Sequence, residues 1–181
     1  MNVILIGYRG TGKTTVARHL AERLGRGWHD SDAAVEAKQG RPIAEIFLHQ
    51  GELVFRDAET AALEELCRLE DVVLAVGGGA VLREQNRRLL AESGRIVWLT
   101  ADVETILQRV EADQSTASRR PMLTGVGGRS EIEQLLAQRE PVYRQCAELE
   151  VDTREKTPGQ VTDEVMDGLG LADVASRPDG T

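Results

Sequence analysis

The most constraining feature of the sequence is a glycine-rich loop near the N-terminus. Residues 7–14 read G-Y-R-G-T-G-K-T and fit the phosphate-loop (P-loop) pattern G-x-x-x-x-G-K-[ST]. A short apolar run, residues 3–6, precedes the loop, and an amphipathic stretch, residues 14–24, follows it. Gly10 and Gly12 let the backbone N–H groups turn inward, and the helix that follows adds the positive end of its dipole. A strand, a loop and a helix in this order predict a binding site for the phosphates of a nucleoside triphosphate.

The same loop carries side chains suited to phosphate chemistry. Lys13 can reach the β- and γ-phosphates, and the Thr14 hydroxyl can coordinate Mg²⁺. Without nucleotide, Lys13 is expected to line an empty loop. A glycine turn with a chance lysine is the alternative, and the strand and helix patterns on either side argue against it. The residues expected to bind nucleotide are Gly10, Thr11, Gly12, Lys13, Thr14 and Thr15.

Short apolar runs alternate with amphipathic stretches along the chain, which has 181 residues, a length that fits one domain. Runs rich in Val, Ile and Leu predict strands buried on both faces at residues 3–6, 28–31, 72–76, 96–99 and 149–152. Helical patterns cover residues 14–24, 58–69, 84–92, 103–112, 131–145 and 159–169. This alternation predicts an α/β fold with a parallel sheet, right-handed crossovers and helices on both faces.

Two stretches interrupt this alternation. Residues 32–56 form a long helical excursion with breaks at Gly40, Pro42 and Gly51. Residues 112–130 are polar and glycine-rich, and they predict a long, mobile loop. In an α/β fold, insertions collect at the carboxyl ends of the strands, where ligands bind. Both stretches are therefore expected to lie near the site.

The composition limits the binding partners and the cellular compartment that we expect for this protein. The 22 Lys and Arg residues against 30 Asp and Glu residues give a net charge of −8, which argues against broad binding to nucleic acid or an anionic membrane. The 2 cysteines and 3 histidines show neither a disulfide framework nor metal-ligand spacing. No apolar stretch reaches the length of a membrane span. We expect a soluble, cytoplasmic protein with a single domain over residues 1–171 and a disordered tail over residues 172–181.

Acidic residues follow the second predicted strand. Phosphate-loop proteins often place a metal-binding Asp after another strand, but the run at residues 72–76 leads into three glycines, residues 77–79. Asp30 and Asp32 can take this role, because residues two apart in an extended segment face the same side. One carboxylate can then support the Mg²⁺ shell while the other accepts a proton from a substrate hydroxyl. Alternatively, this is an acidic turn in which Asp32 caps a helix over residues 33–38.

The three glycines at residues 77–79 also allow two interpretations. They can form a flexible turn after a strand. They can also form a wall without side chains, along which a small substrate contacts backbone amides. Both interpretations stay open at the level of sequence.

Further short segments follow the phosphate loop in a fixed order. They are Asp30-Ser31-Asp32, Gly40-Arg41-Pro42-Ile43, Glu45-Ile46-Phe47, Gly51-Glu52, Phe55-Arg56, Gly77-Gly78-Gly79-Ala80-Val81, Arg120-Pro121-Met122-Leu123, Arg139-Glu140-Pro141-Val142-Tyr143 and Val151-Asp152-Thr153. Together with the phosphate loop, these segments resemble the shikimate kinase family over residues 2–169. The resemblance implies a three-layer P-loop kinase fold with a five-stranded parallel sheet in the order 2-3-1-4-5, and a lid loop. It also implies transfer of the ATP γ-phosphoryl group to the 3-hydroxyl of shikimate, a step of aromatic amino-acid biosynthesis.

By motif position, the resemblance implies which residues would contact shikimate. These are Asp32, Arg56, Gly78 and Arg139, with a substrate-binding region at about residues 32–61. The residue types suit the ligand, because guanidinium groups pair with a carboxylate and a carboxylate accepts hydrogen bonds from hydroxyls.

The resemblance also implies roles around the nucleotide. A lid at about residues 112–125 would bring Arg120 to ATP and to the transferring phosphate. Thr14 and Asp30 would belong to the Mg²⁺ shell, and the catalytic residues would be Lys13, Asp32 and Arg120. Arg109 and Arg154 are candidates for contacts with adenine, and either can instead be a simple surface charge.

The chain departs from the usual family pattern in three places. An extra run at residues 113–118 precedes Arg120 and leaves the reach of the lid open. Arg119 beside Arg120 makes the catalytic arginine ambiguous by one position. Trp28-His29 stands where an apolar pair is commoner.

Two other functions compete with this one. A kinase of another polyol acid, such as gluconate, needs the same arginines, so composition does not separate the two. A catalytically silent nucleotide-binding regulator would be indicated by loss of Lys13, Asp32 or Arg120, and all three are present. We expect a monomer whose partners are ATP and a small-molecule substrate.

Overall fold

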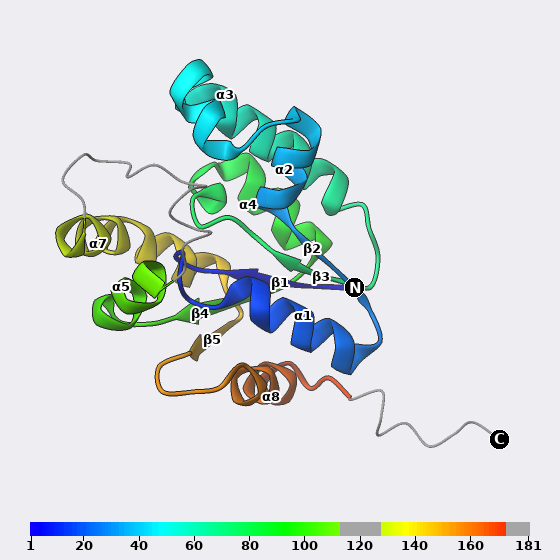
Figure 1. Ribbon diagram of the computed structural model, residues 1–181. Coiled ribbons are helices and arrows are strands. Elements are labelled where there is room, and N and C mark those ends of the chain that lie inside the picture. The colour runs from blue at the N-terminus through cyan, green and yellow to red at the C-terminus, as the bar shows by residue number, and fades with distance from the viewer. Residues whose placement is uncertain (113–127, 173–181) are drawn as a thin grey trace.

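A computed structural model describes residues 1–112 and 128–172 of the chain. The strands are β1 (Asn2–Ile6), β2 (Gly27–Asp30), β3 (Val72–Ala75), β4 (Gly94–Thr100) and β5 (Leu149–Asp152). In this part of the chain they form one five-stranded parallel sheet in the order β2-β3-β1-β4-β5 (Figure 1), which confirms the predicted fold class and strand order.

Helices cover both faces of the sheet (Figure 1). They are α1 (Lys13–Leu24), α2 (Ser31–Gln39), α3 (Ile43–Leu66), the short 3₁₀ helix η1 (Ala80–Leu82), α4 (Glu84–Ser93), α5 (Val103–Ala112), α7 (Arg129–Cys146) and α8 (Pro158–Leu169). None of the helices in the described ranges has the length and apolarity needed to cross a membrane.

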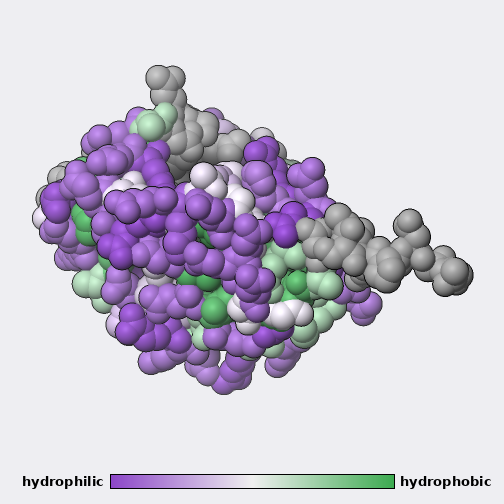
Figure 2. Space-filling view, turned by 90° about the horizontal axis from the view of Figure 1, so that it is seen from below, coloured by the Kyte–Doolittle hydropathy of each residue, from purple (hydrophilic) through white to green (hydrophobic). Residues whose placement is uncertain are grey.

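The two faces follow from the alternation of side chains along each strand. Val3 and Leu5 of β1 pack with α1 and α8, whereas Ile4 and Ile6 pack with α3, α4 and α7. Strand β1 is buried throughout, because helices cover both of its faces and β3 and β4 pair with its two edges. The outer surface on the side of α1 and α8 is mainly hydrophilic, with small apolar areas between the polar side chains (Figure 2).

The expectation that all the strands are buried on both faces is wrong for the two edge strands, β2 and β5. In β5 only Val151 is buried. Strand β2 pairs with β3 at the other edge of the sheet, and Gly27, Trp28 and His29 are exposed. It also ends at Asp30, because Ser31 already belongs to α2. An edge strand has less surface to bury, which explains why His29 and a partly exposed Trp28 stand at this place.

The excursion after β2 is helical, as expected, and its predicted breaks mark real boundaries. Gly40 ends α2 in the left-handed conformation (φ 65°), Pro42 precedes α3, and Gly51 interrupts α3 with φ 84° and ψ 170°. The helix predicted from residue 58 therefore begins at Ile43. Val35, Ile43, Ile46, Phe55 and Ala62 form a small separate core between α2 and α3.

Other predicted segments fall only partly within the described residues. The long loop predicted to reach residue 130 ends earlier, because α7 begins at Arg129. Residues 113–127, which include most of the predicted lid, lie outside the described part of the chain, and so do residues 173–181 of the predicted tail.

Candidate active site

A cavity of about 340 Å³ opens at the carboxyl ends of β1, β2 and β3. The phosphate loop, the first turn of α2 and the glycines after β3 all face this space. Its lining residues are Arg9, Gly10, Gly12, Lys13, Thr14, Thr15, Asp30, Asp32, Ile43, Ala75, Val76, Gly77, Gly78 and Arg109. The structure thus brings together most of the residues that the sequence singled out for nucleotide and metal.

The phosphate loop is shaped by backbone conformations that require glycine. Gly7 has φ 139°, and a Cβ there would lie 2.4 Å from the Leu99 carbonyl oxygen. Gly12 has φ 87° and stands immediately before α1, so that the helix N-terminus points into the cavity. Lys13 lines the cavity, but the expectation that the loop around it is empty is wrong, because its Nζ donates to the Gly7 and Tyr8 carbonyl oxygens at 2.9 and 2.8 Å.

Asp30 joins the start of α2 to the phosphate loop. Its Oδ1 accepts from the backbone N–H groups of Asp32 and Ala33, at 2.9 and 3.3 Å, and its Oδ2 accepts from the Thr14 hydroxyl at 2.7 Å. Asp30, not Asp32, is therefore the N-cap of α2. Both carboxylates line the cavity, but through the first turn of a helix rather than through alternation along a strand.

The pair formed by Thr14 and Asp30 fits a magnesium ion. Mg²⁺ prefers oxygen ligands, takes one or two from the protein and keeps several waters or phosphate oxygens. A hydroxyl and a carboxylate that meet beside the phosphate loop supply such ligands. Among the described residues, no group of three or more His, Cys, Asp or Glu side chains could hold a metal.

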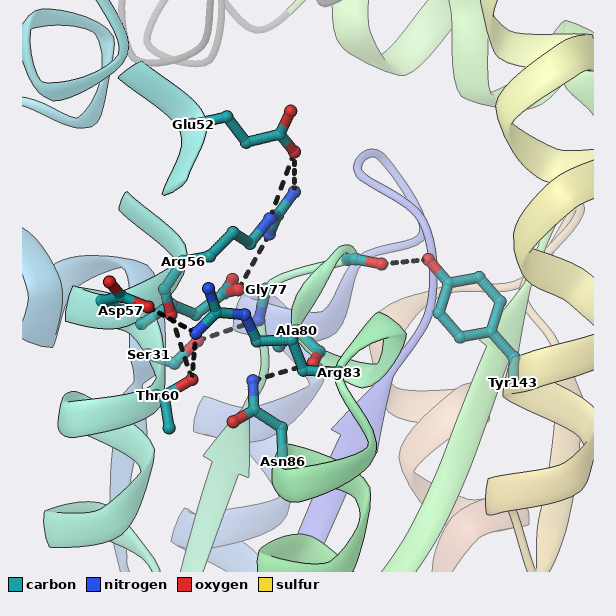
Figure 3. Close-up of polar contacts among 12 residues, drawn as sticks. Ser31, Glu52, Arg56, Asp57, Thr60, Gly77, Ala80, Arg83, Asn86 and Tyr143 are labelled. Atoms are coloured by element: carbon teal, nitrogen blue, oxygen red, sulfur yellow. Dashed lines mark hydrogen bonds and ion pairs between the residues drawn. The ribbon is translucent and has the colours of Figure 1, made fainter. Parts of the chain in front are cut away.

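The glycines after β3 form a wall, and side chains from several helices hold it (Figure 3). Gly77 donates its N–H to the Ser31 hydroxyl at 2.9 Å. The Tyr143 hydroxyl donates to the Gly78 carbonyl oxygen at 2.5 Å. Asn86, fully buried on α4, donates to the Ala80 carbonyl oxygen at 2.9 Å. These bonds favour the interpretation as a wall without side chains over the flexible turn.

Arg56 lies beside this wall, close to Gly79, and it is not among the residues that line the cavity. Its guanidinium group donates to the fully buried Glu59 at 2.8 Å and to Glu52 at 3.2 Å (Figure 3), and it lies 5.0 Å from the centre of the Phe55 ring. Burial opposes the charge, but the two carboxylates outweigh it and raise the Arg56 pKa above its ordinary value. A Cβ at Gly79 would lie 2.6 Å from Nη1 and Nη2 of Arg56, so this arginine requires the glycine.

The remaining predicted arginines lie in different places. Arg139 on α7 is buried, with its guanidinium 5.6 Å from the centre of the Tyr8 ring. Arg109 lines the cavity and donates to the Gly10 carbonyl oxygen at 3.2 Å and to the Thr153 hydroxyl at 2.9 Å. Arg154 is half exposed and pairs with Asp152 and Asp102 around a separate hollow, so it is not brought to the cavity. Arg120 and its neighbour Arg119 lie outside the described residues.

Sequence reasoning missed several residues of the site. Arg9 lines the cavity, and its Nη2 lies 3.8 Å from the buried Glu131 of α7. The Tyr8 ring lies between Arg9 and Arg139, and burial raises the pKa of its hydroxyl although both arginines oppose this. Arg9 occupies a variable position of the loop pattern, so no spacing marked it. Glu59 was not singled out either, and its role follows from its ion pair with Arg56 on the same helix. Ser31 was quoted only as part of the segment Asp30-Ser31-Asp32, because its role depends on a contact between α2 and the wall.

A phosphate loop beside paired carboxylate and hydroxyl ligands, on a parallel sheet in this strand order, defines a kinase of the P-loop class. Residues 9–169 match the shikimate kinase family model. The chain is 40% identical over 178 residues to a shikimate kinase of Rhodopirellula baltica, covering 96% of this chain and 95% of that protein. It is 43% identical over 168 residues to a shikimate kinase of Pseudomonas fluorescens, and the match covers 93% of this chain and 95% of that protein.

A solved structure gives the same result. The shikimate kinase of Acinetobacter baumannii in complex with shikimate superimposes with a TM-score of 0.87 at 39% identity, covering 93% of this chain and 92% of that one. The chain belongs to the shikimate kinase family, and it is therefore an enzyme of a family that uses ATP as co-substrate.

Proposed function

We propose that this chain transfers the γ-phosphoryl group of ATP to the 3-hydroxyl of shikimate, giving ADP and shikimate 3-phosphate for aromatic amino-acid biosynthesis. The observation that carries the proposal is a single cavity lined both by Lys13 and Thr14 and by Asp32 and Gly78. A phosphate donor and a hydroxyl acceptor can meet only where both kinds of group face the same space.

The residues around the cavity have separate tasks in this reaction. The Lys13 ammonium stabilises negative charge on the β- and γ-phosphates. Asp32 orients the 3-hydroxyl and accepts its proton as the oxygen bonds to the γ-phosphorus and the bond to the ADP oxygen breaks. Arg56 and Arg139 bind the carboxylate of shikimate. The backbone amides of the wall at Gly78 contact the shikimate ring. Thr14 and Asp30 would hold Mg²⁺, which, when bound, neutralises phosphate charge.

The proposal extends to parts of the chain beyond the cavity. Residues 112–125 act as a lid that brings Arg120 to the γ-phosphate, residues 32–61 bind substrate, and residues 1–171 form one domain. Arg109 contacts adenine, and its position at the edge of the cavity supports this role, whereas the position of Arg154 does not. The protein acts as a cytoplasmic monomer on small molecules, without nucleic acid or membrane partners, in keeping with its net charge of −8.

A coupled assay of ADP release tests this function directly. We expect turnover with shikimate, at least 100-fold lower kcat/KM with gluconate by the usual scale of polar-group discrimination (about 10²–10⁵), and little ATP hydrolysis without an acceptor. Gluconate turnover equal to that with shikimate would support the other polyol-acid kinase. Strong ATP hydrolysis without any acceptor would contradict both, and no turnover with any acceptor would indicate the silent regulator.

A second prediction concerns the fit between the wall and Arg56. In a Gly79→Ala variant, the added Cβ would meet both terminal nitrogens of Arg56 at 2.6 Å and displace the guanidinium from the place where it binds the carboxylate. We expect KM for shikimate to rise about tenfold or more, by the scale of one charged hydrogen bond, while KM for ATP changes little.

The matched control is Gly159→Ala near the start of α8, where a Cβ meets only the Thr157 hydroxyl at 3.8 Å. This control is expected to leave both KM values unchanged. An unchanged KM for shikimate in Gly79→Ala would mean that Arg56 does not bind substrate from its observed position.

A further inference from the structure

The Tyr143 side chain is fully buried on α7 and ends at the glycine wall. Its ring packs against Trp98 of β4, with ring centres 5.8 Å apart. Its hydroxyl donates to the Gly78 carbonyl oxygen at 2.5 Å (Figure 3). A phenylalanine would fill the same apolar space, so the hydroxyl has a role that packing alone does not require.

This hydrogen bond determines the orientation of the peptide plane between Gly78 and Gly79. The described chain has no cis peptide bond, so the Gly79 N–H points away from the carbonyl that faces Tyr143. Contacts on both sides leave this peptide little room. A Cβ at Gly78 would lie 3.0 Å from the Gly7 carbonyl oxygen, and a Cβ at Gly79 would meet the Arg56 guanidinium. The peptide is therefore enclosed by the phosphate loop, Arg56 and the Tyr143 hydroxyl.

The flanking residues of the wall are held by other side chains. Ser31 accepts from the Gly77 N–H, and Asn86 donates to the Ala80 carbonyl oxygen. In Figure 3, Arg56 and Tyr143 approach this turn from opposite sides. Without its hydroxyl, the ring at residue 143 would leave the Gly78 carbonyl without this buried donor, and the glycine peptide would lose the hydrogen bond that fixes the direction of its carbonyl within this enclosed space.

Tyr143 also lies on the helix that carries Arg139, one of the arginines proposed to bind the substrate carboxylate. Residues four apart in a helix share a face, so Arg139 and Tyr143 project toward the same side of the molecule. Arg139 lies over the ring of Tyr8, the residue that follows Gly7 in the phosphate loop. One face of α7 therefore carries Arg139 and also the Tyr143 hydroxyl, which holds the wall in a fixed position relative to this arginine.

We propose that Tyr143 is a positioning residue for the substrate: its hydroxyl holds the Gly78 peptide so that the wall presents its amides to shikimate beside Arg139. The inference rests on the proposed function, because the orientation of the wall matters for catalysis only if the substrate lies against it. Tyr143 touches neither of the reacting groups and acts through the backbone of Gly78.

The test is Tyr143→Phe, which keeps the ring and removes the hydroxyl. We expect the dissociation constant for shikimate, measured by isothermal titration calorimetry, to rise about tenfold, the scale of one buried hydrogen bond. KM for shikimate should rise in parallel, while KM for ATP and kcat stay within about twofold. Amide hydrogen exchange of a peptide covering residues 77–82 should become faster, which reports directly on the wall.

The matched control is Thr162→Val on α8. Thr162 is buried and its hydroxyl donates to the Pro158 carbonyl oxygen at 2.8 Å, so the variant also removes one buried hydroxyl bond, on the other face of the sheet. It is expected to lower stability without changing shikimate affinity or the exchange of residues 77–82.

The outcomes separate the two proposals. If Tyr143→Phe lowers stability as Thr162→Val does but keeps wild-type shikimate affinity, Tyr143 is only a packing residue and the inference is overturned. An equal loss of affinity for ATP and shikimate also overturns it, because that pattern indicates general distortion. If the wild-type protein fails to bind shikimate, the proposed function is wrong, and this inference is then wrong as well.

Discussion

Replacing Lys13 by alanine is expected to lower kcat by about 10²–10⁴, because the ammonium that stabilises charge on the β- and γ-phosphates is lost. Extra ATP should not restore the rate, since the missing interaction is strongest in the transition state. The measurement is the steady-state rate of ADP release at saturating ATP and shikimate. Near-normal turnover would show that the phosphate-loop assignment is wrong.

The same substitution is also expected to reduce stability. Lys13 donates to the Gly7 and Tyr8 carbonyl oxygens, and both of these residues are buried. We expect the free energy of unfolding in urea to fall by about 1–3 kcal/mol, the scale of hydrogen bonds that involve a charged group. The control is Lys156→Ala, which breaks a surface ion pair to Glu164 on α8 and should cost at most about 1 kcal/mol, with no change in kcat.

The two carboxylates at the start of α2 are expected to give different signatures when each is changed to its amide. Asp32→Asn should lower kcat about 100-fold or more by the usual scale of general-base loss, and additional Mg²⁺ should not rescue it. Asp30→Asn should raise the Mg²⁺ concentration needed for half-maximal rate, with partial recovery at high metal, because a neutral amide is a weaker ligand. Titration of the initial rate with MgCl₂ at fixed ATP measures both effects.

The structure makes this comparison sharper than the sequence did. Asp30 caps α2, and asparagine is about as good an N-cap as aspartate, so Asp30→Asn is expected to fold normally and report on the metal alone. If Asp30→Asn is insensitive to metal and Asp32→Asn is rescued by it, the two roles are reversed. If neither substitution matters, the segment is simply a helix start and the metal site is elsewhere.

Local patterns were enough to predict the phosphate loop and the interior of the sheet. The loop at residues 7–14 is determined by conformations that its own glycines permit, so its pattern can be recognised without knowledge of distant contacts. The apolar runs that became β1, β3 and β4 are buried in the sheet, and continuous apolar sequence predicts this well. The strand order followed from resemblance to the family rather than from periodicity.

Errors arose where a residue's environment depends on its place in the sheet or on a nearby element. Burial of β2 was overestimated, because a short run does not reveal whether a strand lies at an edge. Asp32 was considered as a helix cap because Asp30 was assigned to an extended segment, whereas the strand ends one residue earlier and Asp30 takes the cap. Residues 43–56 were predicted to be helical but separate from the helix at residues 58–69, whereas α3 runs from Ile43 to Leu66 with one break at Gly51.

The sequence by itself determined that the chain builds a phosphate-binding loop on a parallel α/β sheet, because glycine conformations and apolar runs are local properties. Only the tertiary structure decided what surrounds the glycines after β3. Ser31, Arg56 and Tyr143 reach them from three helices, and Asn86 on a fourth helix holds the adjoining Ala80. Tyr143 is 65 residues from its partner Gly78. A buried backbone carbonyl takes its partner from whichever element packs beside it, and that choice is made by the packing of helices on the sheet, not by neighbours along the chain.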